Sequence, residues 1–152
     1  MTIQEAIAGI DGRKPNTVPE ETKLRWLEEL DWEIFRDVLL THQGPVPEFT
    51  GYPEDMSRED REATPLLAPA PYDSMYLYCL ESRIDYENGE LGRFNNSNAM
   101  FRTVFDAFRN WYNRTHRAES QASATLIERK TSAGVLQLRH SLGRLLIRSS
   151  TN

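Results

Sequence analysis

The sequence predicts a small all-α protein, a bundle of about four helices, and three observations lead to that class. Apolar residues recur every three or four positions over residues 3–11, 19–41, 72–88 and 91–115, as they do on one face of an amphipathic helix. Residues 43–71 hold six of the eight prolines, a density that favours a long loop over a helix. The chain has 152 residues, which is the size of one ordinary domain with its own core.

The first two helices have recognisable starts. Thr2 is expected to cap the first helix, and Glu5 stands at its third position, which completes a capping box. Gly12 and Pro15 are expected to end that helix. Pro19 suits the first turn of the second helix. Apolar residues of this second helix occupy more than one side, so we expect it to have more than one packing neighbour.

The fourth helix carries an aromatic stripe, and we expect it to be the best-defined core helix. The turn dipeptide Asn88-Gly89 separates it from the third helix. The small polar run Asn95–Asn98 allows two interpretations: a helix that begins near Asn95 or Asn96 with capping side chains, or polar residues that lie against another backbone or subunit. The stripe consists of Leu91, Phe94, Phe101, Val104, Phe105, Phe108, Trp111 and Tyr112.

The proline-rich loop has a charged tip at residues 54–62. The runs 48–52 and 64–68 on either side of this tip could pair as a short β-hairpin. A loop this long is uncommon in a domain unless it is functional or mobile. Arginines interrupt the spacing that a calcium loop requires, so we expect a surface that faces a partner, not a metal. The residues assigned to it are Glu54, Asp55, Arg58, Glu59, Asp60 and Arg61.

The C-terminal part differs from the rest of the chain in net charge and in composition. We therefore divide the chain into a helical domain, 1–117, and a linker with a docking tail, 118–152. Residues 117–152 carry a net charge of +4, against −9 for residues 1–116. The apolar and basic run 135–148 fits the period of a helix or of a strand equally well. The residues expected to dock this tail on the portal or on a neighbouring subunit are Leu136, Leu138, Arg139, Leu142, Arg144, Leu145, Leu146 and Arg148.

Residues that could carry out chemistry are few, and we predict no catalytic site, no metal and no cofactor. Cys79 is the only cysteine and lies in an apolar run, which is typical of a buried thiol. His42, His116 and His140 show no metal-ligand spacing, and no glycine-rich phosphate loop is present. No apolar run is long enough to span a bilayer. The N-terminus lacks the basic start of a signal peptide, so we expect a protein made in the cytoplasm and not associated with a membrane.

A series of segments in a fixed order carries a resemblance to a known family. Together they resemble the head-tail connector, or adaptor, proteins of long-tailed bacteriophages and prophages, and the likeness covers residues 1–117. The segments are Thr2–Ile7, Asp11–Asn16, Leu24–Val38, Phe49–Tyr52, Leu66–Tyr76, Ile84–Glu90, Phe94–Phe101 and Trp111–His116.

The resemblance implies a structural virion protein of the phage neck, made in the bacterial host. Such subunits form a ring, typically a dodecamer, between the portal protein and the tail or the next connector (a stopper or head-completion protein). DNA passes through the ring without specific binding, and a C-terminal segment often reaches into the portal. The charged loop would then face the channel or a docked partner. The alternative is a small nucleic-acid-binding regulatory protein of a phage or prophage. That class requires a basic recognition helix, and we expect the tail to be the only basic stretch of the chain.

Overall fold

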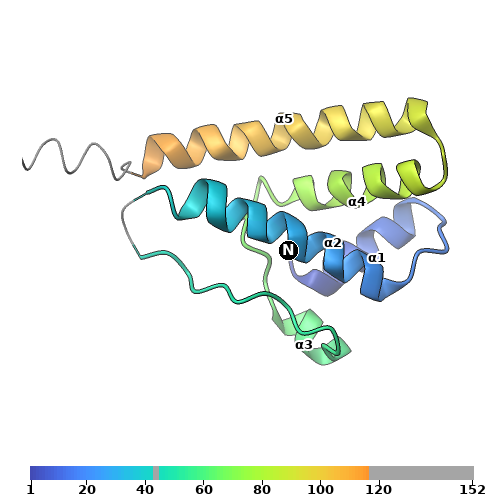
Figure 1. Ribbon diagram of the computed structural model, residues 1–152, viewed down its shortest axis with the longest axis horizontal. Helices are drawn as coiled ribbons and strands as arrows, with labels where there is room; N and C mark the ends of the chain where they lie inside the picture. The colour runs from blue at the N-terminus through green and yellow to red at the C-terminus, as the bar shows by residue number, and fades with distance from the viewer. Residues whose placement is uncertain (43–44, 117–152) are drawn as a thin grey trace, which may run out of the picture. The chain divides into compact units, whose positions relative to one another are not determined.

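Helices make up most of the described structure, which confirms the all-α class. The computed structural model describes residues 1–42 and 45–116 (Figure 1), and this part of the chain contains no β-strand. The elements in chain order are α1 (Ile3–Arg13), α2 (Glu20–Ile34), the π-helical turn η1 (Phe35–Leu39), α3 (Arg58–Ala63), α4 (Ser74–Glu87) and α5 (Leu91–Thr115).

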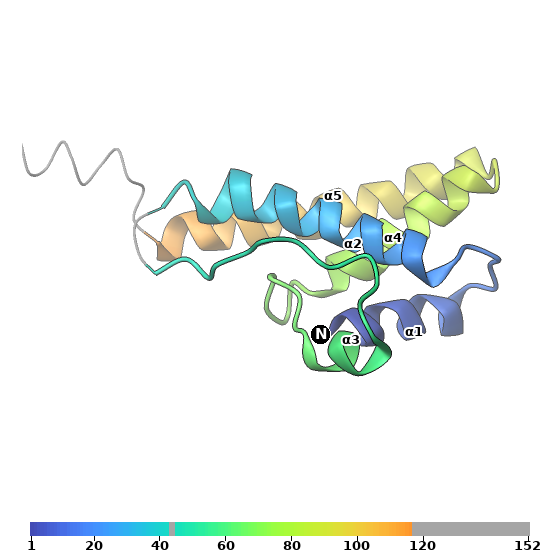
Figure 2. The ribbon, with the colours of Figure 1, turned by 60° about the horizontal axis from the view of Figure 1, so that its bottom comes forward.

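The helices pack around one core, with α4 in the middle. α4 and α5 form an antiparallel hairpin, and α2 and α1 pack against α4 (Figures 1 and 2). The short helix α3 packs on α1, at the edge opposite α5 in both views. Side chains from α1, α2 and α4 are completely buried in this core, among them Ile7, Leu27, Ile34, Leu80 and Ile84.

The N-terminal capping box forms as predicted. The Thr2 hydroxyl accepts a hydrogen bond from the Glu5 amide at 3.2 Å, and the Glu5 carboxylate accepts one from the Thr2 amide at 2.8 Å. The helix continues through Gly12 and ends at Arg13, because one glycine in an exposed turn is tolerated. Helix α2 changes at Phe35 into η1, where the Leu40 amide donates to the Phe35 carbonyl at 2.9 Å. This wider turn buries both Val38 and Leu39.

The prediction of a β-hairpin in residues 43–71 is wrong. In the described structure, the second run instead forms an antiparallel bridge, between Pro65 and Thr2. The Ile3 amide donates to the Thr64 carbonyl at 3.2 Å, and the Leu66 amide donates to the Met1 carbonyl at 3.1 Å. Pro65 has no amide hydrogen to donate to a neighbouring strand. The run 64–68 therefore pairs with the N-terminus over only a few residues and forms no strand. The charged tip is not entirely a loop either, because α3 forms within it.

Helix α5 is less buried than its aromatic stripe predicted. Phe108 and Tyr112 are buried, whereas Phe101, Phe105 and Trp111 are only partly covered. The reason is that α5 lies along one edge of the bundle and, among the described helices, packs only against α4 and η1 (Figure 1). The capping interpretation of residues 95–98 is also wrong, because the helix begins four residues earlier, at Leu91.

Candidate docking surface

The proline-rich segment is anchored to the bundle through one buried carboxylate, Asp31 of α2. The Tyr52 hydroxyl donates to Asp31 Oδ2 at 2.5 Å, and the Tyr76 hydroxyl of α4 donates to Oδ1. The Leu67 amide also donates to Oδ2, at 3.4 Å, and the Ala68 amide donates to the Tyr76 hydroxyl at 2.9 Å. Asp31 therefore joins α2, α4 and two parts of the segment.

Burial dominates the acid–base behaviour of this network. Loss of water around Asp31 raises the pKa of its carboxyl from 3.8 to about 6, although three hydrogen bonds favour the ionised form. Burial, together with the nearby charge of Asp31, raises the pKa of the Tyr52 and Tyr76 hydroxyls. Both tyrosines therefore remain protonated donors. Asp31 shares the apolar spacing of α2, so the sequence alone gave no sign that it is a polar centre.

Gly51 brings the same segment close to α2. Its φ of +90° lies in the left-handed region, which favours glycine. A Cβ at this position would collide with Glu28 Oε1, the oxygen that accepts a hydrogen bond from the Tyr52 amide at 3.2 Å. Phe49 adds an apolar contact, because its ring packs edge-on against Trp32 with centroids 4.9 Å apart. The segment is thus attached to α2 by both polar and aromatic contacts.

The predicted partner-facing residues lie in and just before α3, and they do not form one uniform group. Ser57 caps α3 by accepting a hydrogen bond from the Asp60 amide at 3.1 Å. Arg61 is partly buried and pairs with Glu20 of α2 at 2.9 Å, so it holds α3 in place. Arg58 pairs with Glu62 on the surface at 3.1 Å. Glu54, Asp55 and Glu59 are exposed, and their carboxylates make this end of the molecule acidic.

A shallow groove of about 230 Å³ lies beside these residues, between α2 and residues 52–54. Its lining combines three carboxylates and one guanidinium with one leucine and one tyrosine side chain. A lining of this kind suits a basic side chain with an aliphatic stem. The lining residues are Glu21, Leu24, Arg25, Glu28, Tyr52 and Glu54.

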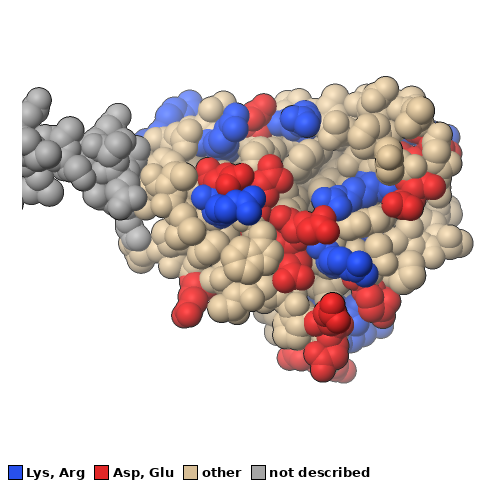
Figure 3. All heavy atoms as spheres, in the orientation of Figure 1, with Lys and Arg blue, Asp and Glu red and all other residues tan. Residues whose placement is uncertain are grey.

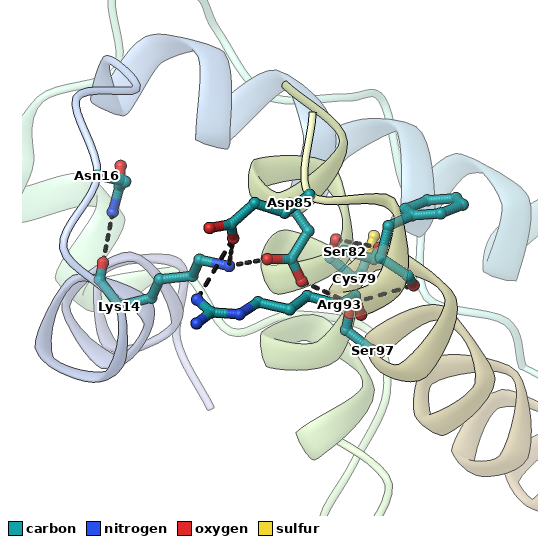
Figure 4. A network of polar contacts seen from close by, with 9 residues as sticks. Lys14, Asn16, Cys79, Ser82, Asp85, Arg93 and Ser97 are labelled. Carbon is teal, nitrogen blue, oxygen red and sulfur yellow. Dashed lines mark hydrogen bonds and ion pairs between the residues drawn. The ribbon is translucent and has the colours of Figure 1, made fainter. Parts of the chain in front are cut away.

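A second buried polar network joins the end of α1 to the α4–α5 turn (Figure 4). Lys14 forms an ion pair with the buried Asp85 and a second one, at 3.2 Å, with Glu90. The Ser97 hydroxyl donates to Asp85 Oδ2 at 2.9 Å. Ser97 is itself buried where α5 crosses α4, so a polar residue of the Asn95–Asn98 run lies against another helix of the same chain. The contacts of Lys14 and Ser97 with Asp85 therefore join the end of α1, α4 and the first turns of α5.

The surface charges are distributed unevenly between α5 and the remainder of the body. Helix α5 carries four arginines and one aspartate, a net charge of +3, whereas residues 1–90 carry 20 acidic and eight basic residues, a net charge of −12. In Figure 3, blue spheres predominate along the upper edge, over α5, and red spheres gather at the lower end, over α3. The tail is therefore not the only basic stretch of the chain, because the exposed side of α5 is also basic.

In the described structure, Cys79 is buried, and His42 and His116 lie at the C-terminal ends of helices. Burial raises the pKa of the Cys79 thiol to about 11, which leaves it protonated and weakly nucleophilic near neutral pH. His42 and His116 lie at helix ends, with Nδ1 3.0 Å from the Val38 carbonyl and 3.2 Å from the Tyr112 carbonyl. Within residues 1–42 and 45–116, no three His, Cys, Asp or Glu residues come together as a metal site.

The predicted docking residues of the tail, Leu136 to Arg148, lie outside the described residues, as does His140. No helix in the described part is both long and apolar enough to cross a bilayer. No known protein family, no curated protein and no solved structure matches this chain.

Proposed function

We propose that this chain is a non-enzymatic structural protein of a long-tailed phage or prophage, the subunit of an adaptor ring. The ring would connect the portal protein to the tail or to the next connector, and would extend the DNA channel. The observation that carries this proposal is the ordered series of segments over residues 1–117 that resembles connector proteins.

Residues of the same segments form the buried hydrogen bonds that join the helices, and this supports the proposal. Tyr52 and Tyr76 come from two of them and meet at Asp31, which belongs to a third. Asp85 and Ser97 come from two others and meet where α4 crosses α5. A likeness confined to surface residues would give less support to a shared architecture.

The charge distribution is compatible with a channel protein. Residues 1–116 carry a net charge of −9, so most of the body repels phosphate groups. The alternative, a nucleic-acid-binding regulator, is favoured by one observation, the basic exposed side of α5. That side carries a net charge of only +3 on an acidic body, and duplex binding normally requires a larger basic surface.

The tail tests the proposal most directly. We expect a chain that ends after Ser123 to melt at nearly the wild-type temperature, because the described core lies within residues 1–116. The same truncated chain should no longer co-sediment with purified portal rings, because the leucines and arginines of residues 135–148 provide the anchor. Thermal unfolding measured by circular dichroism and sedimentation with portal rings are the two measurements.

A matched variant keeps the tail at full length and removes its apolar contacts. Changing Leu138, Leu142, Leu145 and Leu146 together to Ser should abolish portal binding as completely as the truncation does. Normal portal binding by either variant would refute the anchoring role. If the wild-type chain ignores portal rings and instead binds duplex DNA with a steep salt dependence, the regulatory alternative replaces the connector function.

A further inference from the structure

The outer side of α5 is a helix face with no partner among the described residues. Ala99, Thr103 and Ala107 follow one another at four-residue spacing along it, all exposed, and Met100 beside them is 42% exposed. Small side chains let another surface approach a helix closely. Arg102 and Arg114 are exposed and have no acidic partner among the described ion pairs, whereas Arg109 is neutralised by Asp106 at 2.8 Å.

The opposite edge of the molecule has the opposite charge. Glu54, Asp55 and Glu59 are exposed at and before α3, and no arginine or lysine of the described part pairs with them. The groove beside them adds Glu21 and Glu28. Figures 1 and 2 place α5 and α3 on opposite edges of the bundle, and Figure 3 shows blue over the first and red over the second.

We propose that the outer side of α5 docks against the acidic α3 edge of a second copy of this chain. Because the two surfaces are different, the contact is head-to-tail, and it repeats until a ring closes. The choice of a second copy rests on the proposed ring function, and complementary charge on one chain supports it independently. Arg102 and Arg114 of one copy lie against Glu54, Glu59 and the groove of the next.

A second copy suits the surface better than a nucleic acid. Arg102 and Arg114 are 12 residues apart on one helix, about 18 Å, which gives two separated charges and not a continuous basic track. Residues 1–90 carry a net charge of −12, and this charge repels a phosphate backbone that extends past α5. The compact α3 edge of a second copy would contact α5 without extending over the acidic residues 1–90, and so would avoid that repulsion.

The test reverses the charge of each surface separately in the full-length chain. One variant carries Arg102→Glu with Arg114→Glu, and the other carries Glu54→Lys with Glu59→Lys. Sedimentation at low salt and high protein concentration should show self-association of the wild type that weakens as salt is added. Each variant alone should associate at least about tenfold more weakly, because its own two surfaces now repel each other. An equimolar mixture of the two should regain wild-type association, because opposite charges face each other again.

The control carries Arg13→Glu with Arg36→Glu, which alters the net charge by the same amount as the α5 variant at two other exposed positions, where Arg36 forms only a surface ion pair with Asp37. It should associate as the wild type does. A wild type that stays monomeric under these conditions, or a mixture that stays as weak as its components, overturns the proposal. So does binding of single-stranded or duplex DNA that only the α5 variant loses. Portal rings are absent from this assay, so failure of portal binding and failure of self-association are separate results.

Discussion

The buried carboxylate of Asp31 makes stability depend on pH in a defined direction. Its pKa is 3.8 when exposed and about 6 in the folded protein, so the folded state holds this proton more tightly. The resulting stabilisation is complete below pH 4 and is lost as pH rises through about 6. Relative to Asp31→Asn, the wild type should therefore lose about 2–3 kcal/mol of unfolding free energy between pH 4 and pH 7. Urea unfolding of both proteins across this pH range measures the difference in their unfolding free energies. The contributions of the other titrating groups are common to both proteins and cancel.

The Tyr52→Phe variant serves as the control for this assignment. It removes a hydrogen bond that lowers the pKa of Asp31, so the loss of stability should extend to higher pH. A difference between wild type and Asp31→Asn that does not change with pH would contradict the role of Asp31.

Periodicity predicted that Phe105 and Phe108 of α5 are both core residues, whereas the structure buries them to different extents. Phe108 is 1% exposed, whereas Phe105 is only partly buried. Phe108→Ala should cost about 3–5 kcal/mol of unfolding free energy. Phe105→Ala should cost clearly less, because its ring keeps part of its contact with water in the folded state. Equal losses in denaturant unfolding would show that α5 is rotated from its position in the structure.

At the scale of elements, Gly51 controls how the proline-rich segment lies on α2. Gly51→Ala should destabilise the protein by on the order of 1–3 kcal/mol, because alanine is strained at a φ of +90° and its Cβ meets Glu28. Gly89→Ala provides the control, since Gly89 also has a positive φ, +71°, but nothing within contact of the added Cβ. We expect faster proteolysis within residues 45–57 only for Gly51→Ala. Equal cleavage of both variants would mean that the segment is held elsewhere.

Periodicity was sufficient to predict the four longer helices, but not the contacts between them. The Thr2 capping box follows from local sequence, because both partners lie within one turn. The Asp31 network depends on residues 21 and 45 positions away, and no local pattern reports such distances. Serine is a residue type that often caps helices, but Ser97 lies inside α5. Its position is explained by its hydrogen bond to Asp85 of α4. The short helix α3 has only six residues, too few to show a helical period, and the prolines on either side of it favour a loop.

At the scale of the whole molecule, folding, self-association and portal binding should be separable. The described core is built from residues 1–116, and the two proposed self-association surfaces are α5 and the α3 edge. A chain that ends after Ser123 should therefore still self-associate at low salt while losing portal binding. Light scattering of the truncated and full-length chains at matched concentrations checks this expectation. Loss of self-association on truncation would place part of the subunit contact in the tail.

The position of charge at opposite edges also affects how two molecules meet. The net charge is +3 on α5 and −12 on residues 1–90, so charge of opposite sign is separated within the described part of each molecule. Two such molecules exert a torque on each other before they touch, and the favourable orientation places the α5 edge of one toward the α3 edge of the other. The rate of productive encounter should therefore fall as added salt shortens the range of this torque.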